Sequence, residues 1–105
     1  MENFKYKFCR NALGVPQFDV SPPYEGLSEL GSCENVAEIV DELKKLSNGK
    51  LGEYSFGYEV YLIECNSQLC KVIDTYNKWD IILELPVDDV FYLMTTWRNF
   101  LNAST

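Results

Sequence analysis

The segment that follows Pro86 constrains the fold most, because its apolar residues recur at helical spacing. Pro86 can open a helix, and Asp88 and Asp89 then lie in the first turn, where negative charge interacts favourably with the helix dipole. The pattern predicts an amphipathic helix that ends near Asn102 and must bury one face against another layer. Its apolar stripe comprises Val90, Leu93, Met94, Trp97, Phe100 and Leu101.

Strand-like segments precede this helix. Residues 53–65 are rich in aromatic and β-branched side chains and are apolar on both faces, so we expect a single strand at the centre of a sheet. A turn at 66–69 leads to a strand over 70–76, and a turn at 77–78 leads to a strand over 79–85. This order predicts a meander of antiparallel hairpins.

The N-terminal half predicts one more strand and one more helix. Phe4, Tyr6 and Phe8 alternate with polar residues, which indicates a strand. Residues 10–31 contain glycine and proline throughout and predict a long loop with a short extended piece at 17–20. Ser32 can cap a helix that begins near Cys33 and stops at Asn48 and Gly49. The apolar stripe of that helix comprises Val36, Ile39, Val40, Leu43 and Leu46.

These elements predict one α+β domain that spans residues 1–105. The expected order is β-α-β-β-β-α. In it, the N-terminal strand joins the three-stranded meander in an antiparallel sheet of about four strands, and two amphipathic helices cover one face.

Charge is distributed unevenly along the chain. The sequence holds 16 acidic and 9 basic residues, has a net charge of −7 and contains no histidine. Residues 11–43 contain no lysine or arginine. A surface of this sign repels nucleic acid and anionic lipid and attracts basic proteins. The N-terminus has no apolar run of signal-peptide length and no segment could span a bilayer, so we expect a cytosolic protein with no membrane contact.

The four cysteines do not predict a metal site. Cys9, Cys33, Cys65 and Cys70 include no closely spaced pair of the kind that zinc sites use, and histidine is absent. Cys65 and Cys70 flank a predicted turn, so a disulfide is geometrically possible, but the cytosolic expectation favours reduced thiols. No residue pattern indicates a nucleophile with a base beside it, so we expect neither an enzyme nor a cofactor.

Acidic residues in and before the first helix form the candidate partner-binding site. Glu34, Glu38 and Asp41 recur at helical spacing away from the apolar stripe, with Glu42 beside them. The preceding loop adds further acids and an aromatic side chain, a mixture that suits a protein interface. An ordinary solvated helix face beside a polar loop is the alternative. The full candidate set comprises Asp19, Tyr24, Glu25, Glu29, Glu34, Glu38, Asp41 and Glu42.

The C-terminal half resembles a known family. It reads YEVYLIE, then KVIDTYNKWDIILELP, then VDDVFYLMTTWRNFL. The order and character of these elements over residues 58–101 resemble small bacterial immunity proteins of contact-dependent growth inhibition and related polymorphic toxin systems. The resemblance implies a cytosolic protein that binds and neutralises its cognate toxin domain. Many such toxins are basic nucleases, and an acidic inhibitor could cover the substrate-binding or active site. The resemblance assigns no binding residues.

Other functions stay open on the sequence alone. A non-enzymatic adaptor without a toxin partner is one alternative, and it could self-associate through exposed aromatics such as Tyr61 and Trp79, although Trp79 is expected to pack across strands. A small-molecule binder on the aromatic sheet is another, and it would need a deep apolar pocket. The oligomeric state and the choice between plugging an active site and binding beside it are not determined by the sequence.

Overall fold

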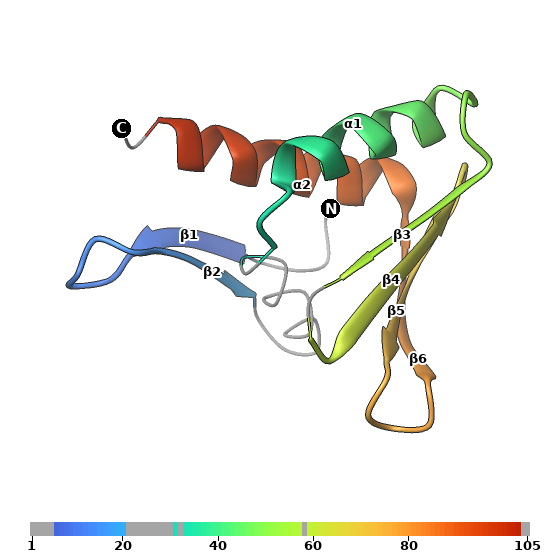
Figure 1. Cartoon of the computed structure of the whole chain (residues 1–105), viewed down its shortest axis with the longest axis horizontal. Coiled ribbons are helices and arrows are strands. Elements are labelled where there is room, and N and C mark those ends of the chain that lie inside the picture. The colour runs from blue at the N-terminus through green and yellow to red at the C-terminus, as the bar shows by residue number, and fades with distance from the viewer. Residues whose placement is uncertain (1–5, 21–30, 32, 58, 104–105) are drawn as a thin grey trace.

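The computed structural model describes residues 6–20, 31, 33–57 and 59–103 of the chain (Figure 1). These residues form, in order, β1 (Tyr6–Arg10), β2 (Pro16–Val20), α1 (Val36–Ser47), β3 (Glu53–Gly57), β4 (Tyr61–Asn66), β5 (Leu69–Asp74), β6 (Asp80–Pro86) and α2 (Val87–Asn102).

The main sheet is an antiparallel meander of β3, β4, β5 and β6 in that order. Helices α1 and α2 pack against each other on the same side of this sheet (Figure 1). The predicted α+β class, with two helices and an antiparallel sheet of four strands, is confirmed. The extended piece predicted at residues 17–20 is confirmed as β2.

The membership of the sheet was predicted wrongly. The N-terminal strand β1 does not join the meander but pairs with β2 in a separate two-stranded sheet. The fourth strand of the main sheet arises instead because the segment predicted as one strand, 53–65, divides into β3 and β4. The reason is local. Gly57 approaches the Tyr61 carbonyl so closely that a Cβ would overlap it, so the pairing of Gly57 with Leu62 requires a residue without a side chain.

Within the predicted loop over 10–31, β2 begins at Pro16, one residue before the extended piece predicted at 17–20. Residues 21–30 and Ser32, the proposed cap, lie outside the described part of the chain. Helix α1 begins at Val36, later than expected, and Asn35 precedes it without a capping bond from its side chain. The predicted stop is confirmed, because α1 ends at Ser47 and Gly49 adopts a φ of +75°.

The core lies between the helices and the facing side of the sheet. The register places Phe56, Ile63, Val72 and Leu83 in one row across the strands, directed at the helices. Every predicted stripe residue of α1 is buried, and in α2 the stripe is buried up to Trp97, while Phe100 and Leu101 are half-buried. Residues with no exposed surface include Ile39, Leu43, Leu46, Val72, Leu93 and Met94.

Four aromatic rings attach the small sheet to α2. The centroid of Trp97 lies 5.1 Å from that of Phe8, 5.3 Å from that of Phe18 and 5.6 Å from that of Phe100. Phe8 and Phe18 face each other in the β1–β2 register, so both rings reach the helix from one side of the hairpin. This cluster continues the core beyond the main sheet.

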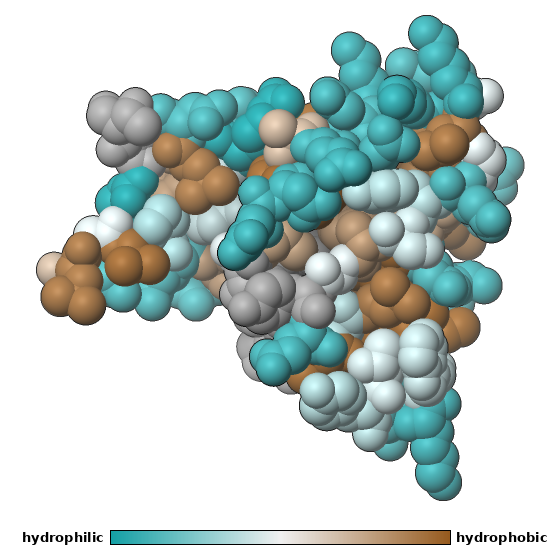
Figure 2. All heavy atoms as spheres, in the orientation of Figure 1, coloured by the Kyte–Doolittle hydropathy of each residue, from teal (hydrophilic) through white to brown (hydrophobic). Residues whose placement is uncertain are grey.

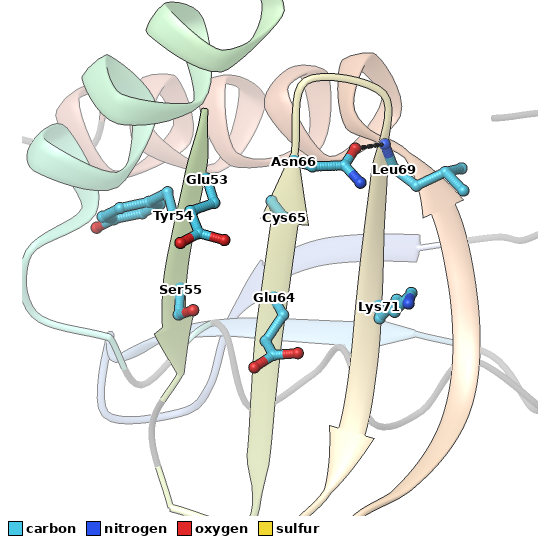
Figure 3. Close-up of a pocket in the computed structure, with 8 residues that line it drawn as sticks. All are labelled: Glu53, Tyr54, Ser55, Glu64, Cys65, Asn66, Leu69 and Lys71. Atoms are coloured by element: carbon cyan, nitrogen blue, oxygen red, sulfur yellow. Dashed lines mark hydrogen bonds between the residues drawn. The ribbon is translucent and has the colours of Figure 1, made fainter. Parts of the chain in front are cut away.

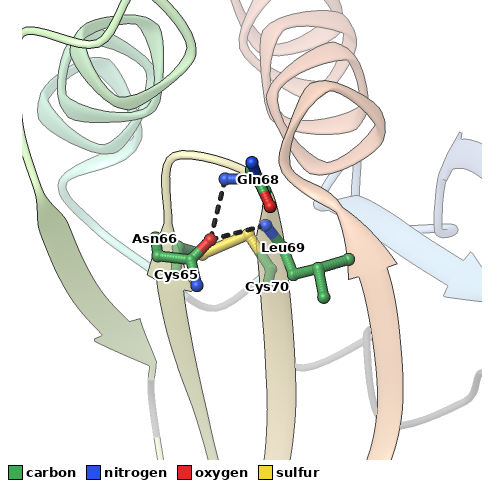
Figure 4. Close-up of a disulfide and its surroundings, with 5 residues drawn as sticks. All are labelled: Cys65, Asn66, Gln68, Leu69 and Cys70. Carbon is green, nitrogen blue, oxygen red and sulfur yellow. Dashed lines mark hydrogen bonds between the residues drawn. A yellow bond between two sulfur atoms is a disulfide. The ribbon is translucent and has the colours of Figure 1, made fainter.

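Cys65 and Cys70 are joined by a disulfide (Figure 4). The expectation of reduced thiols was therefore wrong for this pair, because the register of β4 and β5 places the two residues directly opposite each other. The turn between them is tight. The Asn66 side-chain oxygen accepts hydrogen bonds from the backbone N–H groups of Gln68 at 2.7 Å and Leu69 at 2.8 Å. Cys9 and Cys33 keep their thiol groups.

Candidate protein-binding surfaces

Helix α1 carries three of the four carboxylates predicted on it, whereas Glu34 precedes the helix, which begins at Val36. We define the α1 surface as Glu34, Glu38, Asp41 and Glu42. The first three are exposed and Glu42 is half-buried, and the region around α1 is strongly hydrophilic in Figure 2. The helix holds these groups in place because its opposite face is fully buried.

The α1 surface changes character along the helix. Glu42 accepts a hydrogen bond from Lys45 at 3.0 Å, and this bond and the negative charge of Glu42 raise the pKa of Lys45. Lys44 and Lys50 lie nearby. Carboxylates thus dominate the first turns and lysines the last. A shallow depression of about 540 Å³ spans this boundary and is lined by Glu38, Asp41, Glu42, Lys44, Lys45, Asn48 and Lys50.

Tyr54 belongs to this surface although the sequence did not predict it. It lies on β3, half-buried, on the side of the sheet that faces the helices. Burial raises the pKa of Tyr54, and the negative charges of Glu38 and Glu42 raise it further. Only the tertiary structure brings this strand to α1, so no local sequence signal could have identified the residue.

Of the remaining predicted site residues, the structure describes Asp19 alone, which lies on β2 and not on α1. Asp19 is exposed on β2, opposite Lys7 in the register, and accepts a long hydrogen bond from the Cys9 thiol at 3.8 Å. Tyr24, Glu25 and Glu29 lie outside the described residues.

The sheet face turned away from the helices is polar in the part that Ser55, Glu64, Lys71 and Glu84 cross. A shallow depression of about 470 Å³ lies on it, between β3, β4 and β5 (Figure 3). Glu64 faces Ser55 on one side and Lys71 on the other, and Lys71 faces Glu84, so acidic and basic groups alternate. Both depressions have charged linings and neither has the enclosed apolar lining that a small-molecule site usually requires.

Exposed apolar side chains gather on the β5–β6 hairpin. Tyr76, Trp79, Ile81 and Ile82 are all exposed. The expected packing of Trp79 across strands was wrong, because the residue lies in the turn before β6 and its side chain is 60% exposed. Tyr61, which the sequence proposed as an exposed aromatic, is half-buried against the core.

Neither a metal centre nor a membrane span emerges from the described residues. No group of three or more His, Cys, Asp or Glu side chains within them is arranged to hold a metal ion. None of the helices they form has the length and apolar character to cross a membrane.

Comparison of this chain with protein-family models, curated proteins and solved structures gave no match. The fold and surfaces therefore define it as a small α+β domain whose prominent surface features are a carboxylate-bearing helix and an apolar hairpin.

Proposed function

We propose that this chain is an immunity protein that binds a cognate toxin domain, a basic nuclease, and neutralises it by covering its substrate-binding or active site. The observation that carries the proposal is the α1 surface, where carboxylates project from a helix with a fully buried opposite face. The resemblance of residues 58–101 to immunity proteins supplies the partner class.

The electrostatics favour a basic protein as the partner. A nuclease must present a positive surface to its polyanionic substrate, and the same surface attracts carboxylates. The net charge of −7 adds a long-range field that speeds the encounter with such a domain. Because the opposite face of α1 is fully buried, the helix backbone is already ordered before binding.

We propose a cytosolic location, where such a toxin would act. The disulfide is an observation against this location, because reducing systems keep most cytosolic thiols unpaired. Cys65 and Cys70 are only 4% and 0% exposed, however, so the bond is shielded from soluble reductants. Burial makes the disulfide compatible with a reducing compartment.

The proposal is tested by measuring whether the chain binds a toxin domain and whether it protects cells from that domain. The chain is co-expressed with the reading frame immediately upstream of its gene, which serves as the toxin-domain candidate, and growth, complex formation and the association rate across a salt series are measured. We expect growth to be restored and a one-to-one complex to form, with association slowing as salt rises. If the chain neither binds this domain nor protects cells, the proposal is wrong.

A matched pair of variants locates the surface. The double variant Glu38→Gln with Asp41→Asn removes two negative charges from α1. The control Glu53→Gln with Glu64→Gln removes two from the far sheet face, where both residues are exposed. We expect the α1 variant to associate about fivefold more slowly than the control, because steering depends on where the charge lies. Equal rates would exclude α1 as the steering surface.

The alternative function is an adaptor domain with no toxin partner, which the exposed apolar side chains of the β5–β6 hairpin favour. Such a domain would bind through this hairpin and would not protect cells from the upstream toxin candidate. The growth assay therefore separates the two functions.

A further inference from the structure

We infer that the β5–β6 hairpin is the surface on which the toxin domain buries apolar contact area, an inference that rests on the proposed function. We define the hairpin surface as Tyr76, Trp79, Ile81 and Ile82. Their side chains are 74%, 60%, 50% and 43% exposed, respectively, within a segment of seven residues. Single exposed apolar residues are common, but four of them on one hairpin make that hairpin a candidate interaction site.

A buried apolar side chain, that of Ile73, lies beside Ile81 of the hairpin surface. The register aligns Leu62, Ile73 and Ile81 in one row across β4, β5 and β6. Ile73 is 5% exposed, yet it does not belong to the core cluster under the helices. Its neighbours Cys70 and Val72 do belong to that cluster. Ile73 is thus buried apart from the core, and Ile81 extends its apolar row to the edge of the sheet.

The backbone of the hairpin places Trp79 outward at an energetic cost. Lys78 and Trp79 have φ values of 57° and 61°, in the left-handed region that bulky side chains avoid. The turn is nevertheless closed by a hydrogen bond from the Asp80 N–H to the Asn77 carbonyl at 3.1 Å. Asn-Gly is the usual solution for two such positions. Strain of this kind concentrates at functional sites, and here it presents an indole to solvent.

The edge of the sheet favours contact through side chains rather than addition of a strand. Strand β6 is the last strand of the main sheet. Its register with β5 shifts by one residue: Val72 lies opposite Leu83, but the next residue, Ile73, lies opposite Ile81. Ile82 therefore has no opposite residue on β5. A bulge of this kind twists an edge and discourages another strand from pairing with it. A partner therefore meets the exposed rings and isoleucines.

Charge selects a basic partner over a second copy of the chain. If β6 paired with itself in antiparallel fashion about Ile82, Asp80 of each copy would lie opposite Glu84 of the other, and like charges in this arrangement are destabilising. Each copy also carries a net charge of −7. Asp74 and Asp80 border the hairpin surface at the two strand ends and outnumber Lys78, the one lysine of the turn, so the local charge is also negative and suits a partner with basic residues around an apolar centre.

The hairpin surface and the α1 surface have separate roles. Figure 1 shows the β5–β6 turn at the end of the sheet that points away from α1. Charge on α1 acts at a distance and affects the association rate, whereas the apolar area that the hairpin buries in the complex affects the dissociation rate. The two surfaces can therefore be distinguished kinetically.

The test compares Trp79→Gly with Lys78→Gly, using the toxin-domain candidate encoded upstream as the probe. Each substitution places glycine at one strained position, so we expect both variants to fold and to unfold at a higher temperature than the wild type. Only Trp79→Gly removes the indole. We expect its complex to dissociate at least about tenfold faster than the complex of Lys78→Gly, as for an aromatic hot spot.

Fluorescence gives a second readout. Trp79 is exposed and Trp97 is buried, so burial of Trp79 in the complex would shift the emission of the wild type to shorter wavelength, and Trp79→Gly would lose that shift.

If the complex forms and both glycine variants dissociate at the same rate, the inference is wrong although the proposed function stands. If the wild type does not bind the probe, both the inference and the proposed function are wrong. If the free chain dimerises and only Trp79→Gly is monomeric, the occupant is a second copy and the inference is overturned.

Discussion

Cys65 and Cys70 lie directly opposite each other on β4 and β5, with their Cα atoms 4.0 Å apart and their sulfur atoms bonded. The bond closes a loop with a sequence separation of only five residues. It lies within the core, in a row that continues to Tyr54 on one side and Leu85 on the other. The disulfide therefore reinforces the middle hairpin of the main sheet.

Removal of this bond should lower stability moderately. For a loop this short, the loss of chain entropy in the unfolded state predicts about 2 kcal/mol. We expect the double variant Cys65→Ala with Cys70→Ala to unfold at a lower urea concentration than the oxidised wild type. A reductant that reaches the bond should lower the urea concentration at which the wild type unfolds and should leave that of the double variant unchanged. Titration of the denatured oxidised chain should find the thiols of Cys9 and Cys33 alone, and a count of four would contradict the bond.

The aromatic cluster predicts that the small sheet depends on Phe18. This ring is 4% exposed and packs edge-on against Trp97. Truncation by Phe18→Ala should destabilise the protein by about 3 kcal/mol, because it removes a buried ring and leaves a cavity. Leu13→Ala, in the turn of the same hairpin and 87% exposed, is the control and should change the unfolding free energy by less than about 0.5 kcal/mol. Similar losses in both variants under urea would show that the ring cluster does not hold the hairpin.

The reversal between β3 and β4 predicts a position where a methyl group is not tolerated. A Cβ at Gly57 would overlap the Tyr61 carbonyl oxygen and lie 3.2 Å from the Leu62 Cα, and both are backbone atoms that cannot move aside cheaply. We expect Gly57→Ala to cost about 2 kcal/mol. A Cβ at Gly52 meets open space, so Gly52→Ala serves as the control and should cost nothing measurable. Thermal unfolding of the two variants is the measurement, and an unchanged Gly57→Ala protein would refute this account of the turn.

Tyr54 predicts a loss of stability at high pH. Its pKa is raised above the ordinary value of 10.0, first by burial and then by Glu38 and Glu42. The folded protein thus keeps the phenol proton at pH values where the unfolded chain loses it. The stabilising difference is fully present below about pH 10 and is lost as pH rises through the folded-state pKa. We expect Tyr54→Phe to flatten this part of the stability profile, measured by urea unfolding at increasing pH.

Neutralising the nearby acids checks the cause. In a Glu38→Gln with Glu42→Gln variant, the pKa of Tyr54, followed by NMR, should fall only part of the way to its ordinary value, since burial is the larger cause. A complete return would assign the shift to charge alone.

Much of the fold could be predicted because its signals are local. The apolar stripes of α1 and α2 recur at helical spacing, and burial of such a stripe is required wherever the helix packs. The turn at Ser67 and Gln68 and the turn before β6 were also indicated by polar residues between apolar runs. The division of 53–65 was missed, because it depends on a close backbone approach that only a glycine at position 57 permits, and the aromatic residues on both sides of Gly57 read as one continuous strand.

The candidate site was predictable only in part. The exposure of Glu38 and Asp41 follows from their position opposite the apolar stripe, whereas Glu34 lies before the helix begins. The approach of Tyr54 to that surface depends on β3 lying beside α1, and the exposure of Trp79 depends on a strained turn. Neither feature is encoded by a short-range pattern.

The helices, the acidic charge of the molecule and the antiparallel meander follow from the amino-acid sequence without further information, because each depends on periodicity, composition or turn chemistry within a few residues. Tertiary packing was needed to establish that β1 pairs with β2 rather than with the meander, that Cys65 meets Cys70, and that Trp79 and Ile81 form an apolar surface at the sheet edge. These outcomes depend on strand register and on packing between segments distant along the chain, where the free energy is set by which surfaces can be buried together.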